Sequence, residues 1–193
     1  MTLAFSYPYY LLKRQVLALT GKLRFYSPDD RLVLFAEQKM FRLREDIRVY
    51  DDESKSQELL LIQARQIIDW AAAYDVVDSL SGQKVGALRR RGWASLLRDE
   101  WEVLDPNDQL LGLLCEDRIS RALLRRFLLG ALLPQNYDIR LGQTRVAVLR
   151  QKFTFFGYQM EIDFSMDAAG RLDRRLGIAA AVLLAIIEDK QQN

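Results

Sequence analysis

The stretch Leu176–Ile187, LGIAAAVLLAII, decides the fold that we expect for this chain. It is the longest apolar run without a charge, and charged residues at 174–175 and 188–190 bound it. A helix that spans a bilayer needs about 20 apolar residues, so we predict a buried helix over residues 173–188 instead. Its apolar side chains point all round the helix axis, which requires that other elements surround it.

A second signal is a triplet of apolar, charged and apolar residues that recurs along the chain. Alternation with a period of two is typical of a strand with one wet and one dry face. Turn-forming residues such as Asp105-Pro106-Asn107-Asp108 follow each triplet, and a return strand follows the first five. The return strand of the sixth is left open. The triplets are Leu23–Phe25, Ile47–Val49, Tyr74–Val76, Trp101–Val103, Tyr137–Ile139 and Met160–Ile162.

A sheet that closes on itself covers a helix on every side and leaves no unpaired edge. We therefore predict one mainly β (α+β) domain over residues 1–193. It is a closed antiparallel barrel of about twelve strands around the central hydrophobic C-terminal helix. One extra amphipathic helix is expected within residues 117–134, with Arg121, Arg125 and Arg126 on its basic face.

The composition narrows the classes of function. The 193 residues carry a formal charge of +2, include one cysteine and contain no histidine. Charge this close to balance gives no support to a nucleic-acid partner, and a single cysteine excludes an internal disulfide framework. Without histidine the commonest general base and zinc ligand are missing. We expect no enzyme, no cofactor, no metal site and a cytoplasmic location.

The order of these features resembles a known family. The opening YPYYLLKRQVLALTGKLRFYSPDDRLVLFAEQKMFRL, residues 7–43, is similar to the start of LURP-one-related proteins. The hairpin repeats and the ending GRLDRRLGIAAAVLLAIIE, residues 170–188, resemble the wider group that holds phospholipid scramblases and Tubby C-terminal domains. The resemblance implies a barrel of about twelve strands around a hydrophobic helix. Functions in the group are diverse, so the fold alone says little about function.

Basic clusters are the candidate binding residues. Phosphoinositide binding by the Tubby group suggests an anionic headgroup site at the densest run, Arg89, Arg90 and Arg91. The arginine face at 121–126 and the pair Lys13 and Arg14 are further candidates. Each has an ordinary alternative, because charge runs usually lie on solvated strand ends and basic helix faces pack under loops.

The leading hypothesis is a non-enzymatic module that binds anionic phospholipid headgroups or an acidic protein. Binding to headgroups would place it peripherally at the inner membrane face. A structural or protein-interaction domain without a lipid role is the alternative, as is a scramblase-like protein that moves lipids. Scramblases place a calcium-associated acidic segment where Glu161, Asp163 and Asp167 stand. The spacing here lacks the alternating oxygen ligands of a calcium loop, and we do not predict a metal site.

Overall fold

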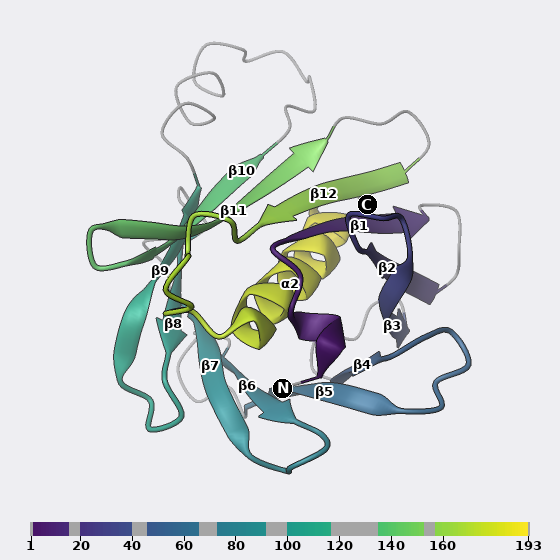
Figure 1. The fold of residues 1–193 in the computed structure, drawn as a ribbon, viewed down its shortest axis with the longest axis horizontal. Helices are drawn as coiled ribbons and strands as arrows, with labels where there is room; N and C mark the ends of the chain where they lie inside the picture. The colour runs from purple at the N-terminus through teal and green to yellow at the C-terminus, as the bar shows by residue number, and fades with distance from the viewer. Residues whose placement is uncertain are drawn as a thin grey trace.

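The computed structural model describes residues 2–15, 20–39, 46–65, 73–91, 100–116, 135–152 and 157–192. Within these residues the chain forms twelve strands, one 3-10 helix and one long helix (Figure 1). The elements are η1 (Leu3–Phe5), β1 (Tyr9–Gln15), β2 (Thr20–Tyr26), β3 (Leu32–Lys39), β4 (Ile47–Tyr50), β5 (Glu58–Ala64), β6 (Ala73–Asp78), β7 (Lys84–Arg90), β8 (Glu100–Leu104), β9 (Leu110–Glu116), β10 (Asn136–Leu141), β11 (Thr144–Lys152), β12 (Gly157–Asp163) and α2 (Arg174–Gln192).

The strands close into a barrel in which every neighbour is antiparallel and the order follows the chain. All six triplets lie in strands, one in each of β2, β4, β6, β8, β10 and β12. The partner that the sequence left open for the sixth triplet is β1. It pairs with β12 from Tyr9 opposite Asp163 to Gln15 opposite Gly157, and this pairing closes the barrel.

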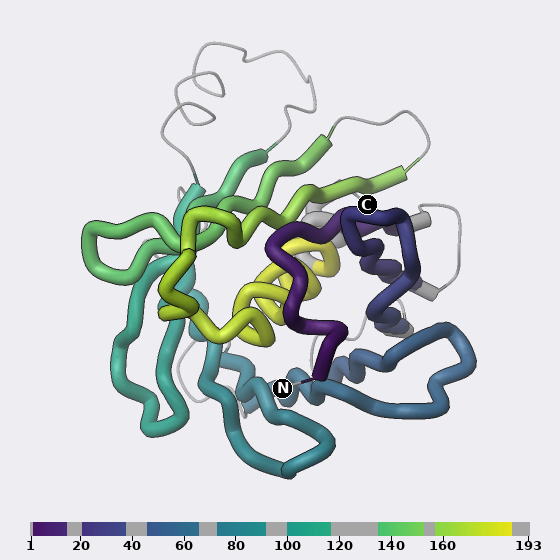
Figure 2. The backbone as a smooth tube through the Cα atoms, viewed as in Figure 1, coloured from purple at the N-terminus to yellow at the C-terminus, as the bar shows by residue number. Residues whose placement is uncertain are grey.

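Helix α2 runs through the lumen of the barrel, as Figure 2 shows. It begins one residue later and ends four residues later than predicted. Leu176, Ile178, Val182 and Leu184 are each at most 2% exposed, although they point in different directions around the axis. The predicted enclosure of the helix by strands is therefore confirmed. No helix in the described part of the chain combines the length and hydropathy needed to traverse a bilayer.

The two ends of the barrel differ. Tight turns join β2–β3, β4–β5, β6–β7, β8–β9 and β10–β11 at one end, which we call the turn end. The segment 164–173 and η1 close over the start of α2 there, with Phe164 N donating to Pro8 O at 2.8 Å. The odd-numbered strands finish at the opposite end, which we call the far end. The predicted amphipathic helix within 117–134 lies outside the described residues.

The triplets also place a belt of aromatic side chains inside the barrel. Tyr74, Trp101 and Tyr137 begin three successive triplets, and each is the second residue of its strand. All three are at most 3% exposed, and the rings of Tyr74 and Trp101 lie 6.2 Å apart. The repeat thus fills the lumen near the far end with large rings, while the charged residue between the apolar ones faces outward.

Candidate anion-binding surface

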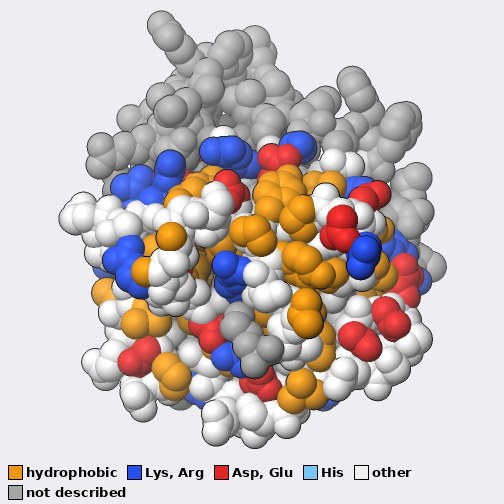
Figure 3. All heavy atoms as spheres, in the orientation of Figure 1, with side chains coloured by type: hydrophobic (Ala, Val, Ile, Leu, Met, Phe, Trp, Pro, Cys, Tyr) orange, Lys and Arg blue, Asp and Glu red, His pale blue; other side chains and the backbone are white. Residues whose placement is uncertain are grey.

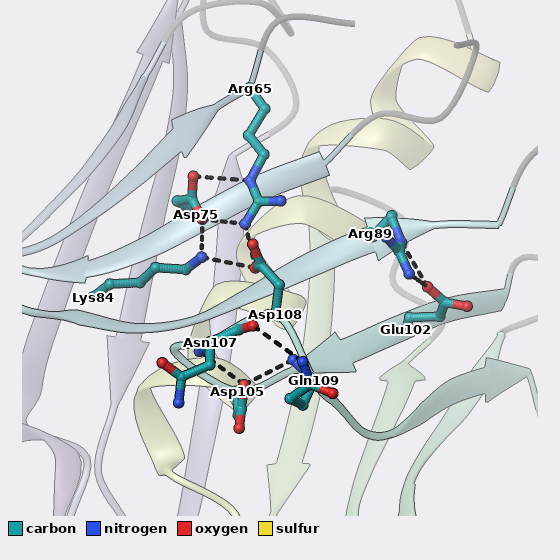
Figure 4. A network of polar contacts seen from close by, with 9 residues as sticks. All are labelled: Arg65, Asp75, Lys84, Arg89, Glu102, Asp105, Asn107, Asp108 and Gln109. Atoms are coloured by element: carbon teal, nitrogen blue, oxygen red, sulfur yellow. Dashed lines mark hydrogen bonds and ion pairs between the residues drawn. The ribbon is translucent and has the colours of Figure 1, made fainter. Parts of the chain in front are cut away.

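The run Arg89, Arg90 and Arg91 does not form one continuous patch. Successive side chains of a strand point to opposite faces, so Arg89 and Arg91 are exposed while Arg90 is half-buried. Arg89 pairs with Glu102 at 2.5 Å (Figure 4), and Arg91 pairs with Glu100 at 3.3 Å. Neighbouring β8 therefore balances the charge of the two outward arginines.

Arg90 lies on the inner side, close to the belt of aromatic residues. Burial raises the pKa of the Tyr74 hydroxyl, and the positive charge of Arg90 partly offsets this effect. Strand alternation and its partial burial place the Arg90 side chain on the face of β7 opposite to that of Arg89 and Arg91.

Lys13 and Arg14 are separated by the same alternation. Arg14 is 5% exposed, donates a hydrogen bond to the carbonyl of Ala185 in α2, and lies 5.0 Å from the Tyr158 ring. Lys13 faces outward. Strands β1 and β7 are six places apart in the ring, so Lys13 lies across the barrel from Arg89. The remaining predicted residues, Arg121, Arg125 and Arg126, lie outside the described residues.

A row of outward side chains crosses four strands in register. Lys152 of β11 stands opposite Gln159 of β12, Gln159 stands opposite Lys13 of β1, and Lys13 stands opposite Arg24 of β2. We call these four residues the basic row. Neighbouring strands lie about 4.8 Å apart, so the row spans about 14 Å. The row itself holds three cations and no carboxylate. Each cation pairs with a carboxylate outside the row: Lys13 with Asp30, Arg24 with Glu53 and Lys152 with Glu161.

Lys13 and Arg24 are like charges placed directly opposite each other, an arrangement that destabilises a sheet. Aromatic rings and turn carboxylates compensate for it. Lys13 Nζ lies 4.5 Å from the centre of the Tyr26 ring and 3.8 Å from Asp30. The Arg24 guanidinium lies 6.0 Å from the Phe35 ring. Cations held beside rings in this way keep a partly desolvated, fixed position.

One further cation, Arg150, flanks the basic row. Arg150 is exposed and stands opposite Glu161 of β12, and it forms no ion pair within the described ranges. Lys152 does pair with Glu161. Burial alone would raise the pKa of Glu161, but hydrogen bonds from Lys152 and Tyr9 and the charge of Arg150 outweigh it and hold that pKa low. Glu161 is therefore a carboxylate at neutral pH.

Other parts of the outer wall are electrically balanced. Arg65 and Lys84 share the two carboxylates of Asp75 and Asp108, with nitrogen to oxygen distances between 2.5 and 3.0 Å (Figure 4). The network fastens the β8–β9 turn, which holds Asp108, onto the outside of β5–β7. Two cations against two anions leave no excess charge to attract a partner.

The face crossed by η1 and residues 164–173 is mixed in character. Figure 3 shows apolar, basic and acidic side chains interspersed over it. Leu3 on this face is 75% exposed, and Arg175 is engaged by Asp78 and Asp173 at 2.5 Å each. Carboxylates stand among the basic side chains of this face, as Asp78 and Asp173 do around Arg175, whereas no carboxylate stands within the basic row itself.

The acidic residues that a scramblase would associate with calcium do not converge. Glu161 pairs with Lys152 on the outer wall, whereas Asp167 is 7% exposed and accepts a hydrogen bond from Leu172 N at 2.8 Å. Among the residues that the structure describes, no group of three or more Cys, Asp or Glu side chains is placed to hold a metal ion.

Of the basic row, the sequence indicated only Lys13 as a candidate binding residue. Lys22 and Arg24 share the wet face of one strand, and alternation alone places them there. The pairing of β1 with β12, however, joins residues far apart in the sequence, from Tyr9 opposite Asp163 to Gln15 opposite Gly157. Local periodicity contains no information on such pairing, so the alignment of Lys13 with Gln159 and Lys152 needed the tertiary structure.

A closed antiparallel β-barrel threaded by its own C-terminal helix, with charge on its outer wall, defines the structural class of this protein. The chain belongs to the LURP-one-related family, since the model of that family, LOR, matches residues 32–185. The resemblance to LURP-one-related proteins inferred from the sequence is thereby confirmed. A crystal structure of an Arabidopsis thaliana protein is similar, with a TM-score of 0.51 and 11% identity over 98% of this chain and 95% of that one.

That likeness concerns the fold alone, because identity is low. No curated protein matched the chain. A proposal about function must therefore be argued from the surface residues of this chain and not from its fold.

Proposed function

We propose that this LURP-one-related domain is a non-enzymatic binding module that attaches to anionic phospholipid headgroups through the basic row. The carrying observation is the register of Lys152, Gln159, Lys13 and Arg24, which places three cations in one line without a carboxylate among them. The absence of histidine from the chain agrees with a role in binding rather than in catalysis.

The strength of such binding comes from several cations acting together. Each Lys or Arg near an anionic membrane contributes about 1 kcal/mol, so a single residue holds a protein only briefly. The row supplies three, and Arg150 beside it supplies a fourth. The closed barrel fixes the backbone positions of these residues, so no ordering of the backbone is needed on binding.

A sedimentation experiment with vesicles tests the proposal. Vesicles of phosphatidylcholine with about 20% phosphatidylserine should pellet the protein at low salt, and pure phosphatidylcholine should not. The double variant Lys13→Gln/Lys152→Gln should bind about 30-fold more weakly, since two contributions of about 1 kcal/mol each are lost. Binding should also fall as salt rises, because screening shortens the reach of exposed charges.

The matched control is Arg89→Gln/Arg91→Gln, which removes two exposed cations from the opposite side of the barrel. It should bind like the wild type. If only this control loses binding, the site is the arginine run on β7 and not the basic row. A wild-type protein indifferent to phosphatidylserine at low salt would leave the protein-interaction role as the explanation.

A further inference from the structure

We infer that Glu53 is an intramolecular competitor that occupies Arg24 of the basic row until an external anion displaces it. The inference rests on the proposed function and adds a mechanism of regulation to the same surface. Its basis is a bidentate contact. Arg24 Nε donates to Glu53 Oε1 at 2.7 Å, and Arg24 Nη2 donates to Glu53 Oε2 at 2.9 Å.

A carboxylate in this geometry presents the same two oxygens that a headgroup phosphate would offer. The planar fork of an arginine side chain matches either group with two parallel hydrogen bonds. An anion that approaches Arg24 must therefore replace Glu53 rather than join it. Glu53 is the more exposed partner, with 45% of its side chain accessible against 21% for Arg24, so it lies on the side from which a partner would come.

The position of Glu53 is built into the β4–β5 turn. In the barrel β3 separates this turn from β2, so Glu53 reaches across the outside of β3 to meet Arg24. Asp52 Oδ1 accepts hydrogen bonds from Ser54 N at 2.8 Å and Ser54 Oγ at 2.6 Å, and Lys55 pairs with Glu37 of β3. Contacts on both sides of Glu53 thus hold the β4–β5 turn in the conformation that places Glu53 against Arg24.

Both partners are charged at neutral pH. The hydrogen bonds from Arg24 hold the pKa of Glu53 below its usual range, and the contact raises the pKa of Arg24. Exposed ion pairs are nevertheless weak, so an anionic surface that also engages Lys13 and Lys152 can displace Glu53. Loss of the competitor should raise affinity about two- to fivefold.

The test compares two variants that each remove one carboxylate. Glu53→Gln frees Arg24, whereas Glu102→Gln frees Arg89 on the opposite side of the barrel and changes the net charge equally. Titration with the phosphatidylserine vesicles should show tighter binding for Glu53→Gln only. In an Arg24→Gln background the gain should vanish, since no arginine remains to be uncovered.

The outcomes separate the inference from the proposed function. Equal gains in Glu53→Gln and Glu102→Gln would mean that net charge alone matters, which overturns the inference and leaves membrane binding intact. Binding by Glu53→Gln where the wild type does not bind would support the inference in its strongest form. If neither the wild type nor Glu53→Gln binds, both ideas fall. Thermal melting of each variant checks that the turn change has not unfolded the barrel.

Discussion

Enclosure of α2 can be tested by truncating two of its side chains that face in nearly opposite directions. Val182 and Leu184 are two residues apart, which places them about 200° apart around the helix axis. They are 0% and 2% exposed. In a helix that merely lay on a sheet, at least one of two such positions would face solvent. In this barrel both should be costly to truncate.

The magnitude follows from the groups removed. Val182→Ala deletes two carbons and Leu184→Ala deletes three, at about 0.8 kcal/mol for each buried methylene before any cavity is counted. With a cavity contribution, the free energy of unfolding should fall by about 2 and about 3 kcal/mol. For a chain of this size that corresponds to decreases of about 4–8 °C and about 6–12 °C in Tm.

Urea denaturation followed by far-ultraviolet circular dichroism measures both losses. The matched control is Leu80→Ala in the β6–β7 turn, where the side chain is 55% exposed. It should change the free energy of unfolding by no more than about 0.5 kcal/mol. If either helix variant behaves like Leu80→Ala, one face of α2 is not covered by strands, and the enclosure reasoning is wrong.

Two further predictions concern the wall of the barrel. A methyl group on Gly112 of β9 would lie 2.1 Å from the backbone oxygen of Arg140. Gly112→Ala should therefore lower the free energy of unfolding by at least about 1–3 kcal/mol. An unchanged Tm would show that β9 and β10 approach each other less closely than the structure has them. Burial would raise the pKa of Asp75, but Arg65 and Lys84 outweigh it and lower that pKa. The ionised Asp75 therefore stabilises the fold above its unfolded pKa of about 3.9, and this stability is lost as pH falls through the lower folded pKa. Urea titrations from about pH 7 to about pH 2 should show Asp75→Asn destabilised at neutral pH and level with the wild type in acid; a constant gap would contradict the assignment.

Part of the candidate site was within reach of the sequence. Arg89, Arg90 and Arg91 form one cluster only in the linear sequence, because successive side chains of a strand point to opposite faces. Applied to β7, the period of two that identified the triplets would have placed Arg90 inside and its two neighbours outside. The same rule separates Lys13 from Arg14. The glutamates that neutralise Arg89 and Arg91 come from β8, and their register with β7 is a tertiary property.

The sequence by itself determined which segments are strands and that the last helix must be enclosed. Both conclusions rest on burial patterns within short segments, where the period of the apolar residues reflects the geometry of the backbone. Only the tertiary structure decided that the first strand closes the barrel against the twelfth, and that Lys152, Gln159, Lys13 and Arg24 form a line. The physical reason is that alternation says which face a side chain occupies, whereas its neighbours on that face depend on the register between strands far apart in the chain.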